Sequence, residues 1–422
     1  MIQLSYLREN AEVVIERLKI KNFDATLYVE KILVADIHRR ETQKKLDNNL
    51  SEQNQIAKQI GILFREGKEK EAQTLKEKTS SLKASAKELE EVLHKEEAHI
   101  NEMLVLLPNL PHASVPAGKS AEDNEIVYSE GDVVVSEWML PHWEICEKLD
   151  IVDFETGVKI TGSGFPLYKG KGARLQRALI NFFLDNAVES GYLEVQTPHL
   201  VNEESAYATG QLPDKEGQMY YINEDNLYLI PTAEVPVTNI YRNTILMETD
   251  FPLKHCAYTA CFRREAGSYG KDVRGLNRLH QFDKIEIVRI EHPQNSYHAL
   301  EEMKEYVASL LRKLELPFRI VRLCGGDISF TSALTFDFEV FAKGQQKWLE
   351  VSSVSNFESF QANRMKLRFK SEGKKPQLAH TLNGSALALP RIVASLLENH
   401  QTQTNTIRIP KALQPYTHFE TL

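Results

Sequence analysis

The sequence contains little cysteine and no long apolar run. Its 422 residues include only four cysteines, and no two of them form a C-x-x-C pair, which argues against a disulfide scaffold and a cysteine-rich zinc site. The apolar run at residues 103–107 is far shorter than the ~20 residues that a membrane helix needs. The opening segment carries Arg8 and Glu9 and lacks the apolar stretch of a signal peptide. We therefore expect a cytoplasmic protein with no membrane partner and no zinc.

Neither sign of charge dominates the chain. Lys and Arg number 51 and Asp and Glu number 59, so the formal net charge is −8, and 42% of the residues are hydrophobic. At ~100–200 residues per domain, this length predicts two or three globular domains. The first hundred residues hold about 18 basic and about 18 acidic side chains, so the negative excess lies in the remainder. A basic group in the first long segment is compatible with nucleic-acid binding or with an ordinary solvated helix face: Lys31, Arg39, Arg40, Lys44 and Lys45.

Residues 68–107 contain no glycine or proline. Steps of three and four from Ala72 meet Leu75, Thr79, Leu82, Ala86, Leu89, Leu93, Glu96, Ile100, Met103 and Leu107. Nine of these eleven positions are apolar, which indicates a coiled coil. A weaker seam in residues 27–64 runs through Val29, Ile32, Leu46, Leu50, Ala57, Ile60 and Phe64. With Gly67 supplying the turn, we expect a long antiparallel helical hairpin, which either reaches a partner or dimerises the protein.

The remainder of the chain lacks the regular strand–helix alternation of a parallel α/β fold. It also lacks a G-x-G-x-x-G after a strand, so a dinucleotide site has no support. Residues 172–189 predict an amphipathic helix, and a strand interrupted by Pro198 follows. Short strands in mixed order predict an α+β domain built on a mainly antiparallel sheet flanked by helices.

Residues 262–290 predict two adjacent strands with polar side chains on one face. Alternation places Arg263 and Glu265 together, and Phe282, Lys284, Glu286 and Val288 together. Phe282 and Glu286 are about 13 Å apart at ~3.3 Å per residue, which suits an adenine nucleotide beside an ammonium-bearing ligand. The alternatives are a core role for Phe282 and an ordinary Arg263–Glu286 ion pair. The loop between the strands holds the cations Lys271, Arg274 and Arg278, and conditionally His280.

The chain resembles seryl-tRNA synthetase of the bacterial type, a class II aminoacyl-tRNA synthetase, over essentially its whole length. The resemblance rests on the helical arm, the linker NLPHASVPAGKSAEDN, and GYLEVQTPHLV as motif 1. It rests further on PTAEVP at 231–236, FRREAGSYGKDVRGLNRLHQFDKIE as motif 2, and LNGSALALPR as motif 3. It implies a tRNA-binding arm at 1–107, a linker at 108–129 and a catalytic domain at 130–422. It also implies a homodimer that joins L-serine to tRNA(Ser) with ATP, and it leaves open whether tRNA(Sec) is charged.

The resemblance also implies roles for individual residues. Arg263 and Arg391 would be catalytic, with Arg263 on the α-phosphate and Arg391 covering the adenine and reaching the γ-phosphate. Glu265 would hold the adenine amino group and Phe282 would stack on the ring. The implied ATP-binding residues are Arg263, Arg264, Glu265, Phe282, Glu350, Val351, Ser352, Ser353 and Arg391. The implied serine-binding residues are Thr232, Ala233, Glu234, Arg263, Glu286, Asn383 and Ser385.

The family binds Mg²⁺ with ATP, and the resemblance implies Glu350 and Ser353 as its ligands. Because these residues face opposite sides of an ideal strand, we expect a bulge between them, with Ser352 as the alternative ligand. Two residues depart from the family pattern: Pro390, expected in the first turn of a helix, and Lys271, where arginine is common. Two other functions stay open, a ligase that charges a carrier protein and an inactive paralogue that acts as a binding module.

Overall fold

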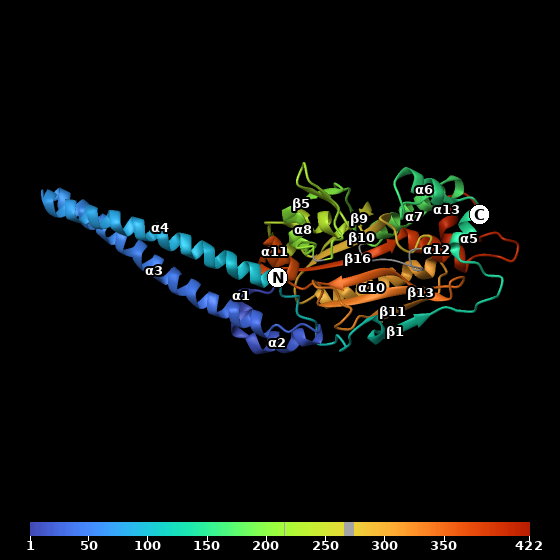
Figure 1. Ribbon diagram of the computed structural model, residues 1–422, viewed down its shortest axis with the longest axis horizontal. Coiled ribbons are helices and arrows are strands. Elements are labelled where there is room, and N and C mark those ends of the chain that lie inside the picture. Colours follow the sequence, from blue (N-terminus) through green and yellow to red (C-terminus); the bar gives the residue numbers. More distant parts are fainter. Residues whose placement is uncertain (215, 266–273) are drawn as a thin grey trace. The chain divides into compact units, whose positions relative to one another are not determined.

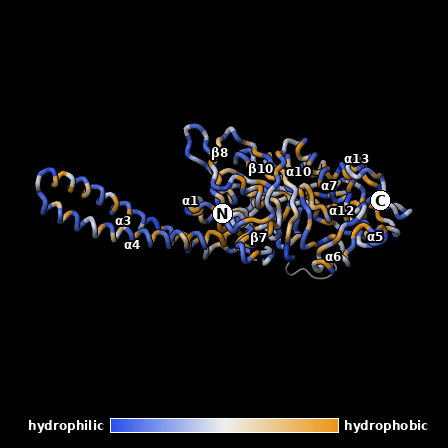
Figure 2. The backbone as a smooth tube through the Cα atoms, turned by 90° about the horizontal axis from the view of Figure 1, so that it is seen from above, coloured by the Kyte–Doolittle hydropathy of each residue, from blue (hydrophilic) through white to orange (hydrophobic). Residues whose placement is uncertain are grey.

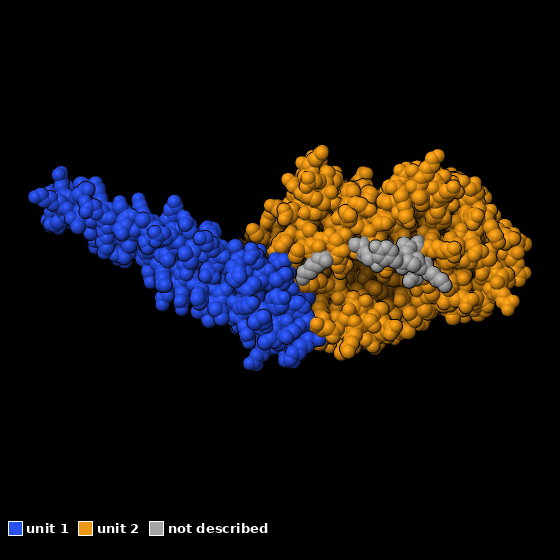
Figure 3. All heavy atoms as spheres, in the orientation of Figure 1, with its two compact units in different colours: residues 1–19, 23–108 blue, residues 20–22, 109–422 orange. Residues whose placement is uncertain are grey.

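A computed structural model describes residues 1–214, 216–265 and 274–422 of the protein. The chain divides into two compact units, shown in different colours in Figure 3. Unit 1 comprises residues 1–19 and 23–108, and unit 2 comprises residues 20–22 and 109–422. No described helix is both long and apolar enough to cross a membrane.

Unit 1 is a helical hairpin. Its helices are α1 (Leu4–Glu9), α2 (Ala11–Ile20), α3 (Thr26–Arg65) and α4 (Glu69–Val105). The two long helices run in opposite directions side by side (Figure 1), and Gly67 turns the chain between them with a positive φ of 74°. At ~1.5 Å per residue, the 40 residues of α3 extend about 60 Å. The expected antiparallel hairpin is confirmed.

The apolar seam of α4 follows the expected heptads, whereas that of α3 departs from them. The eleven expected positions from Ala72 to Leu107 are all buried or half-buried, and hydrophobic residues alternate with hydrophilic ones along both helices in Figure 2. In α3 the expected seam holds at Val29, Ile32 and Leu46. Beyond Leu46 only Ile60 is half-buried as expected, and the other positions were wrong, because Leu50 and Phe64 are 40% and 46% exposed and Ala57 is exposed. Asn49 and Ile56 are buried in their place.

Part of the basic group in α3 has a structural role. Asp36 is fully buried in the hairpin, and its carboxylate pairs with the guanidinium groups of Arg8, Arg39 and Arg40 at 3.0, 2.9 and 3.2 Å. Three cations around one buried carboxylate neutralise it and hold α1 against α3. Lys31, Lys44 and Lys45 of the same group are exposed.

Unit 2 is built on an eight-stranded sheet in the order β1-β11-β12-β13-β16-β10-β9-β4. The strands are β1 (Glu125–Glu130), β4 (Leu193–Glu194), β9 (Leu253–Phe262), β10 (Gln281–Glu291), β11 (Phe318–Arg322), β12 (Leu334–Ala342), β13 (Lys347–Asn356) and β16 (His380–Ala388). Neighbouring strands are antiparallel except β4 and β9, which are parallel. The expected α+β class with a mainly antiparallel sheet is confirmed.

Helices and three small sheets complete unit 2. The helices are α5 (His142–Lys148), α6 (Phe154–Ile160), α7 (Gly170–Glu189), α8 (Glu203–Thr209), α9 (Glu234–Thr238), α10 (Ser296–Lys313), α11 (Phe360–Met365), α12 (Leu389–Asn399) and α13 (Gln414–Thr417). The other strands are β2 (Val152–Asp153), β3 (Leu167–Tyr168), β5 (Leu200–Asn202), β6 (Tyr221–Ile222), β7 (Leu227–Leu229), β8 (Ile245–Met247), β14 (Arg368–Lys370) and β15 (Gln377–Leu378).

The two faces of the large sheet carry different side chains. Ile285 and Ile287 of β10 belong to a large apolar core that also takes in buried residues of α7, α10 and α12. Since side chains alternate along a strand, Lys284 and Glu286 point to the opposite face. The sheet is therefore covered by helices on one side and offers polar groups on the other.

Local features of unit 2 follow the sequence signals. The helix expected at 172–189 is α7, and the expected break at Pro198 separates β4 from β5. Pro390 lies in the first turn of α12, as expected. An N–H group at this position has no intrahelical acceptor, so proline, which lacks that group, loses no hydrogen bond there. Of residues 108–129, expected as a linker, 109–129 belong to unit 2, and the segment from Glu125 onward forms the edge strand β1 of the large sheet.

Candidate active site

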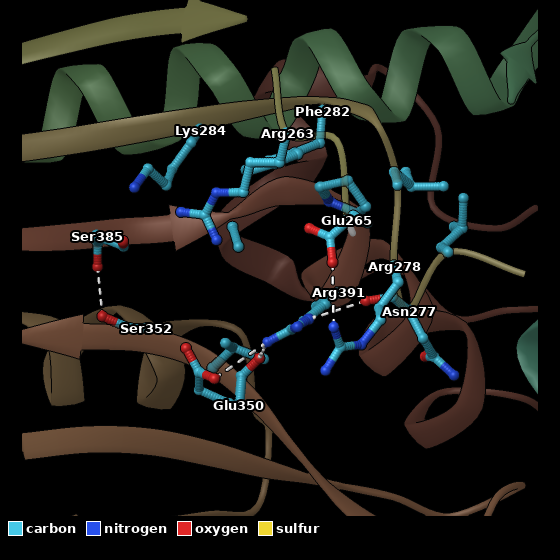
Figure 4. Close-up of a pocket in the computed structure, with 15 residues that line it drawn as sticks. Arg263, Glu265, Asn277, Arg278, Phe282, Lys284, Glu350, Ser352, Ser385 and Arg391 are labelled. Carbon is cyan, nitrogen blue, oxygen red and sulfur yellow. Dashed lines mark hydrogen bonds and ion pairs between the residues drawn. The ribbon is translucent and has the colours of Figure 1, made fainter. Parts of the chain in front are cut away.

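Two cavities lie over the polar face of the large sheet. Figure 4 shows the side chains around the first of them. Six residues line both cavities: Arg263, Glu265, Arg278, Lys284, Glu350 and Ser385. Because the cavities share this wall, they adjoin each other.

The first cavity pairs a guanidinium with an aromatic ring. Arg263 follows directly after β9, and its guanidinium carbon lies 5.2 Å from the ring centroid of Phe282 on β10. The Nε atom of Arg263 donates to the carbonyl of Pro231 at 3.3 Å, which orients the side chain. Glu265 has a φ of 47° and pairs with Arg278 at 3.0 Å. Phe282 is half-buried and lines the cavity, so the alternative of a purely core role does not describe it.

Arg391 closes the same cavity from α12. Its Nη1 atom donates to the backbone carbonyl of Glu350 at 2.6 Å and lies 3.4 Å from the Glu350 carboxylate. Its Nε atom donates to the carbonyl of Asn277 at 3.1 Å (Figure 4). The Arg391 side chain keeps 29% of its surface exposed, so its charge remains available to an anionic ligand.

The second cavity leads to a buried charged network. Glu286 is 1% exposed, and its Oε2 atom accepts from Lys284 Nζ at 2.6 Å and from Thr232 Oγ1 at 3.1 Å. Its Oε1 atom accepts from the amide of Asn383 at 2.9 Å. Glu286 therefore pairs with Lys284, and not with Arg263 as one sequence interpretation allowed.

A second carboxylate lies beside this network. Glu234 is buried at the start of α9 and accepts from Gln361 at 2.6 Å. Burial, with the negative charge of Glu286, raises the pKa of Glu234 to about 7. A cationic group that entered the cavity would favour the ionised form of Glu234, so this carboxyl group is suited to an ammonium ligand.

A bulge in β13 turns two oxygen ligands toward one cavity. Glu339 of β12 pairs with Glu350 while Phe338 pairs with Ser352, so Val351 is the extra residue. The bulge expected between Glu350 and Ser353 is thus present, and both residues line the second cavity.

The serine next to Ser353 has a different role in the sheet. Ser352 is 2% exposed, and its hydroxyl donates to the carbonyl of Ser385 at 2.5 Å. Ser353, and not Ser352, lines the second cavity with Glu350, so it is the better candidate ligand for a cation there.

Asp337 lies next to Ser353 in the sheet but lines neither cavity. It lies directly opposite Ser353 in the β12–β13 pair, and its Oδ1 atom is buried without a hydrogen-bond partner among the described residues. Burial and the charge of Glu350 raise the pKa of Asp337 well above its usual range, although a hydrogen bond from Ser353 opposes the shift. Carboxylate and hydroxyl oxygens fit a hard divalent cation such as Mg²⁺.

Comparison with known proteins identifies the family. Residues 1–111 match the family model of the seryl-tRNA synthetase N-terminal domain, and residues 219–400 match that of the tRNA synthetase class II core domain (G, H, P, S and T). A serine–tRNA ligase of Salinibacter ruber is 50% identical over 421 residues, which span 99% of this chain and 98% of that protein. The chain belongs to the seryl-tRNA synthetase family.

Solved structures of seryl-tRNA synthetases share the fold. That of Pyrococcus horikoshii, complexed with ATP, has a TM-score of 0.93 and 34% identity, and the match covers 100% of this chain and 99% of that chain. The cytoplasmic serine–tRNA ligase of Naegleria fowleri, in complex with AMP, has a TM-score of 0.88 and 26% identity, with coverage of 100% and 98%.

Most residues implied by the family resemblance meet at the two cavities, but not all. The side chain of Arg264 is exposed and lies over the ring of Tyr220, 5.5 Å from its centroid, outside the lining of both cavities. Ala233 is fully buried immediately before α9 and lines neither cavity. Glu286 also lines neither cavity, and it is buried behind Lys284 and Asn383, which line the second one. Lys271 lies outside the described residues.

Sequence reasoning gave no role to two side chains of this family member's site. Lys284 was placed on the correct face of β10, and its alternation with Phe282 and Glu286 was the signal that could have assigned it. Asp337 gave no signal, because its place depends on a pairing with β13 that the sequence does not specify.

Proposed function

We propose that this chain activates L-serine with ATP and transfers the seryl group to the 3′ end of tRNA(Ser). The observation that carries the proposal is the shared wall of the two cavities, where Arg263 and Lys284 lie between an aromatic-lined pocket and a buried carboxylate pocket. Membership of the seryl-tRNA synthetase family supports the same conclusion.

In the first step a serine carboxylate oxygen attacks the α-phosphorus of ATP. A new P–O bond forms as the bond to the β-bridging oxygen breaks, and pyrophosphate leaves. Arg263 stabilises the charge that develops on the α-phosphate, while Phe282 stacks on the adenine and Glu265 accepts from its amino group. Arg391 covers the other side of the nucleotide and neutralises its terminal phosphate. Arg264 has no side-chain role in this scheme.

In the second step a ribose hydroxyl of the terminal adenosine attacks the seryl carbonyl. The hydroxyl loses its proton, the new ester bond forms and AMP leaves with the bonding electrons. Both steps depend chiefly on positioning and on charge neutralisation, which rigid strand ends such as those of β9 and β10 provide.

Glu350 and Ser353, which both line the second cavity, would hold Mg²⁺. When bound, the ion neutralises phosphate charge and orients the leaving pyrophosphate. The oxygen ligands at this edge of the cavity are the support for this assignment.

The carboxylate pocket would recognise serine itself. Glu234 binds the ammonium group, and Glu286, held by Thr232 and Asn383, accepts from the hydroxyl. A buried acceptor that loses its donor is costly, so alanine should be rejected by a factor of ~10⁴ or more. Ser385 contributes to the wall next to the α-phosphate.

The hairpin would bind the long variable arm of tRNA(Ser), with lysines and arginines contacting phosphates. The segment around α7 and β4 would form the homodimer interface, since Val188 and Leu193 are apolar and 47% and 62% exposed. A carrier-protein ligase would not need the hairpin. An inactive paralogue would show lesions at the ATP-binding positions, and Arg263, Glu265, Phe282 and Arg391 are all present.

Substitution of the central guanidinium tests the proposal. Arg263→Ala should reduce serine-dependent ATP–pyrophosphate exchange by about 10³-fold or more, because no other group replaces its charge at the α-phosphate. The matched control is Arg368→Ala, at an exposed arginine that begins β14, which should keep normal exchange. Near-normal exchange by folded Arg263→Ala would refute the assignment.

A further inference from the structure

A fully buried carboxylate that lines neither cavity accepts five hydrogen bonds. Glu398, in the last turn of α12, is 0% exposed. Its Oε1 atom accepts from His142 N, His142 Nδ1 and Gln345 Nε2 at 3.0, 2.8 and 2.7 Å. Its Oε2 atom accepts from the backbone N–H groups of Gly344 and Gln345, both at 3.0 Å. A buried charge with this many donors is fully satisfied, so it holds its neighbours in fixed positions.

The ring of His142 links Glu398 to the backbone of Leu276, which lines the first cavity. His142 is 0% exposed, and its Nε2 atom accepts from the backbone N–H of Leu276 at 2.8 Å. A backbone N–H only donates, so Nε2 carries no proton and Nδ1 carries the proton that is donated to Glu398. The Glu398 carboxylate therefore fixes the His142 tautomer whose Nε2 atom can accept from the Leu276 N–H.

The residue after Leu276 is held from the same centre. The side-chain amide of Asn277 donates to Gln345 Oε1 at 2.8 Å, and Gln345 is bound to Glu398 through both its backbone and its side chain. The Asn277 carbonyl accepts from Nε of Arg391 at 3.1 Å. Glu398 and Arg391 are seven residues apart on α12, about two turns, so they lie on the same face of the helix.

The segment held in this way forms one wall of the nucleotide cavity. Residues 276–279 line the first cavity, and Arg278 pairs with Glu265 across it. Gly275 fits the arrangement, because a Cβ atom there would lie 2.3 Å from His142 Nε2. His142 thus lies against the backbone of both Gly275 and Leu276, and the wall begins at Leu276.

We propose that His142 and Glu398 are positioning residues for ATP. Through Leu276 and Asn277 they fix the wall that carries Arg278 and whose Asn277 carbonyl accepts from Arg391. Neither His142 nor Glu398 lines the cavity. This inference rests on the assignment of the first cavity to ATP under the proposed function. It predicts that the Leu276 hydrogen bond controls ATP binding separately from overall stability.

Two substitutions of His142 separate its two hydrogen bonds. In His142→Asn, the shorter amide keeps a donor near Glu398 and loses the acceptor for Leu276. In His142→Gln, the longer side chain keeps an acceptor for Leu276 and loses the donor to Glu398. We expect His142→Asn to raise the KM for ATP and the Kd for MgATP by about tenfold, because a buried N–H loses its partner, while the KM for serine changes less than about twofold. His142→Gln should stay within about threefold of the unaltered chain.

The measurements are pyrophosphate exchange, titration calorimetry with MgATP, and thermal unfolding of each full-length variant. His255→Asn, at another buried histidine in the half of β9 remote from Arg263, should lower stability without changing the KM for ATP. The proposal is overturned if folded His142→Asn binds MgATP normally, or if ATP affinity follows stability equally in all three variants. Absence of MgATP binding by the unaltered chain would overturn both proposals. Binding without serine-dependent exchange would overturn the proposed function alone.

Discussion

Unit 1, the hairpin, and unit 2, the sheet domain, differ in how many charged side chains they bury. In unit 1, all of whose residues are described, Asp36 is the only buried charged side chain, and most of the other charges face water. In unit 2 the candidate serine pocket alone buries Glu234, Lys284 and Glu286. Burying a charged group lowers the stability of the fold unless the group is fully paired. Unit 2 buries charged groups at its candidate site, whereas unit 1 keeps most of its charges on a long exposed surface. Changes in the two regions should therefore affect different steps.

The largest expected effect is the separation of the two steps by removal of the hairpin. Deletion of residues 27–105, with a short flexible linker in their place, should reduce tRNA charging by about 10³-fold or more, because the phosphate contacts of the hairpin are lost. Serine-dependent pyrophosphate exchange should stay within a few-fold of normal, since the cavities belong to unit 2. Exchange and charging are measured on the same preparation. An equal loss of both activities would mean that the hairpin is only structural.

A smaller effect is expected from the pH dependence of the buried carboxyl group. Because the pKa of Glu234 is about 7, kcat/KM for serine should rise about tenfold between pH 6 and pH 8 as Glu234 ionises. Glu234→Gln should lower activity and flatten this profile. A steep profile that persists in Glu234→Gln would assign the titration to another group.

The same substitution should affect stability with the opposite sign. A raised pKa means that the folded state favours protonated Glu234, so this contribution is full below pH 4.5 and is lost as the pH rises through about 7. Glu234→Gln should therefore unfold at the same denaturant concentration as the unaltered chain at low pH. At pH 8 it should be more stable by about 3 kcal/mol. Equal stability of the two proteins at pH 8 would contradict the burial argument.

The smallest expected effect tests the seam of α3. Ile56 is 4% exposed and Leu50 is 40% exposed. Ile56→Ala should destabilise the hairpin by about 2 kcal/mol or more, and Leu50→Ala by less than about 1 kcal/mol. Hydrogen exchange of the α3 and α4 amides reports the local opening free energy. A larger loss in Leu50→Ala would restore the heptad register that the sequence pattern suggested.

Local signals in the sequence were sufficient for much of the fold. The apolar stripe of α7, the interruption at Pro198 and the helix start at Pro390 each depend on neighbouring residues, and each lies where expected. The seam of α3 was wrong at Leu50, Ala57 and Phe64 because polar residues at 36, 39 and 43 interrupt the repeat. Across that gap the pattern does not fix which of two adjacent residues faces the partner helix.

The site could be predicted only where motifs mark it. Arg263, Phe282 and Arg391 belong to recognisable motifs and meet at one cavity. The contact between His142 and Glu398 joins residues 256 positions apart, and no periodicity connects them. Such partners are set by tertiary packing, which a single sequence does not reveal.

The proposed function requires that a nucleotide and serine lie end to end across the wall that the two cavities share. Pyrophosphate exchange by the unaltered chain, measured with each of the twenty amino acids, tests it directly. We predict strong exchange with serine and exchange with alanine lower by a factor of ~10⁴ or more, because alanine leaves the buried acceptor Glu286 unpaired. Exchange with alanine within tenfold of serine, or no exchange with any amino acid, would contradict the claim.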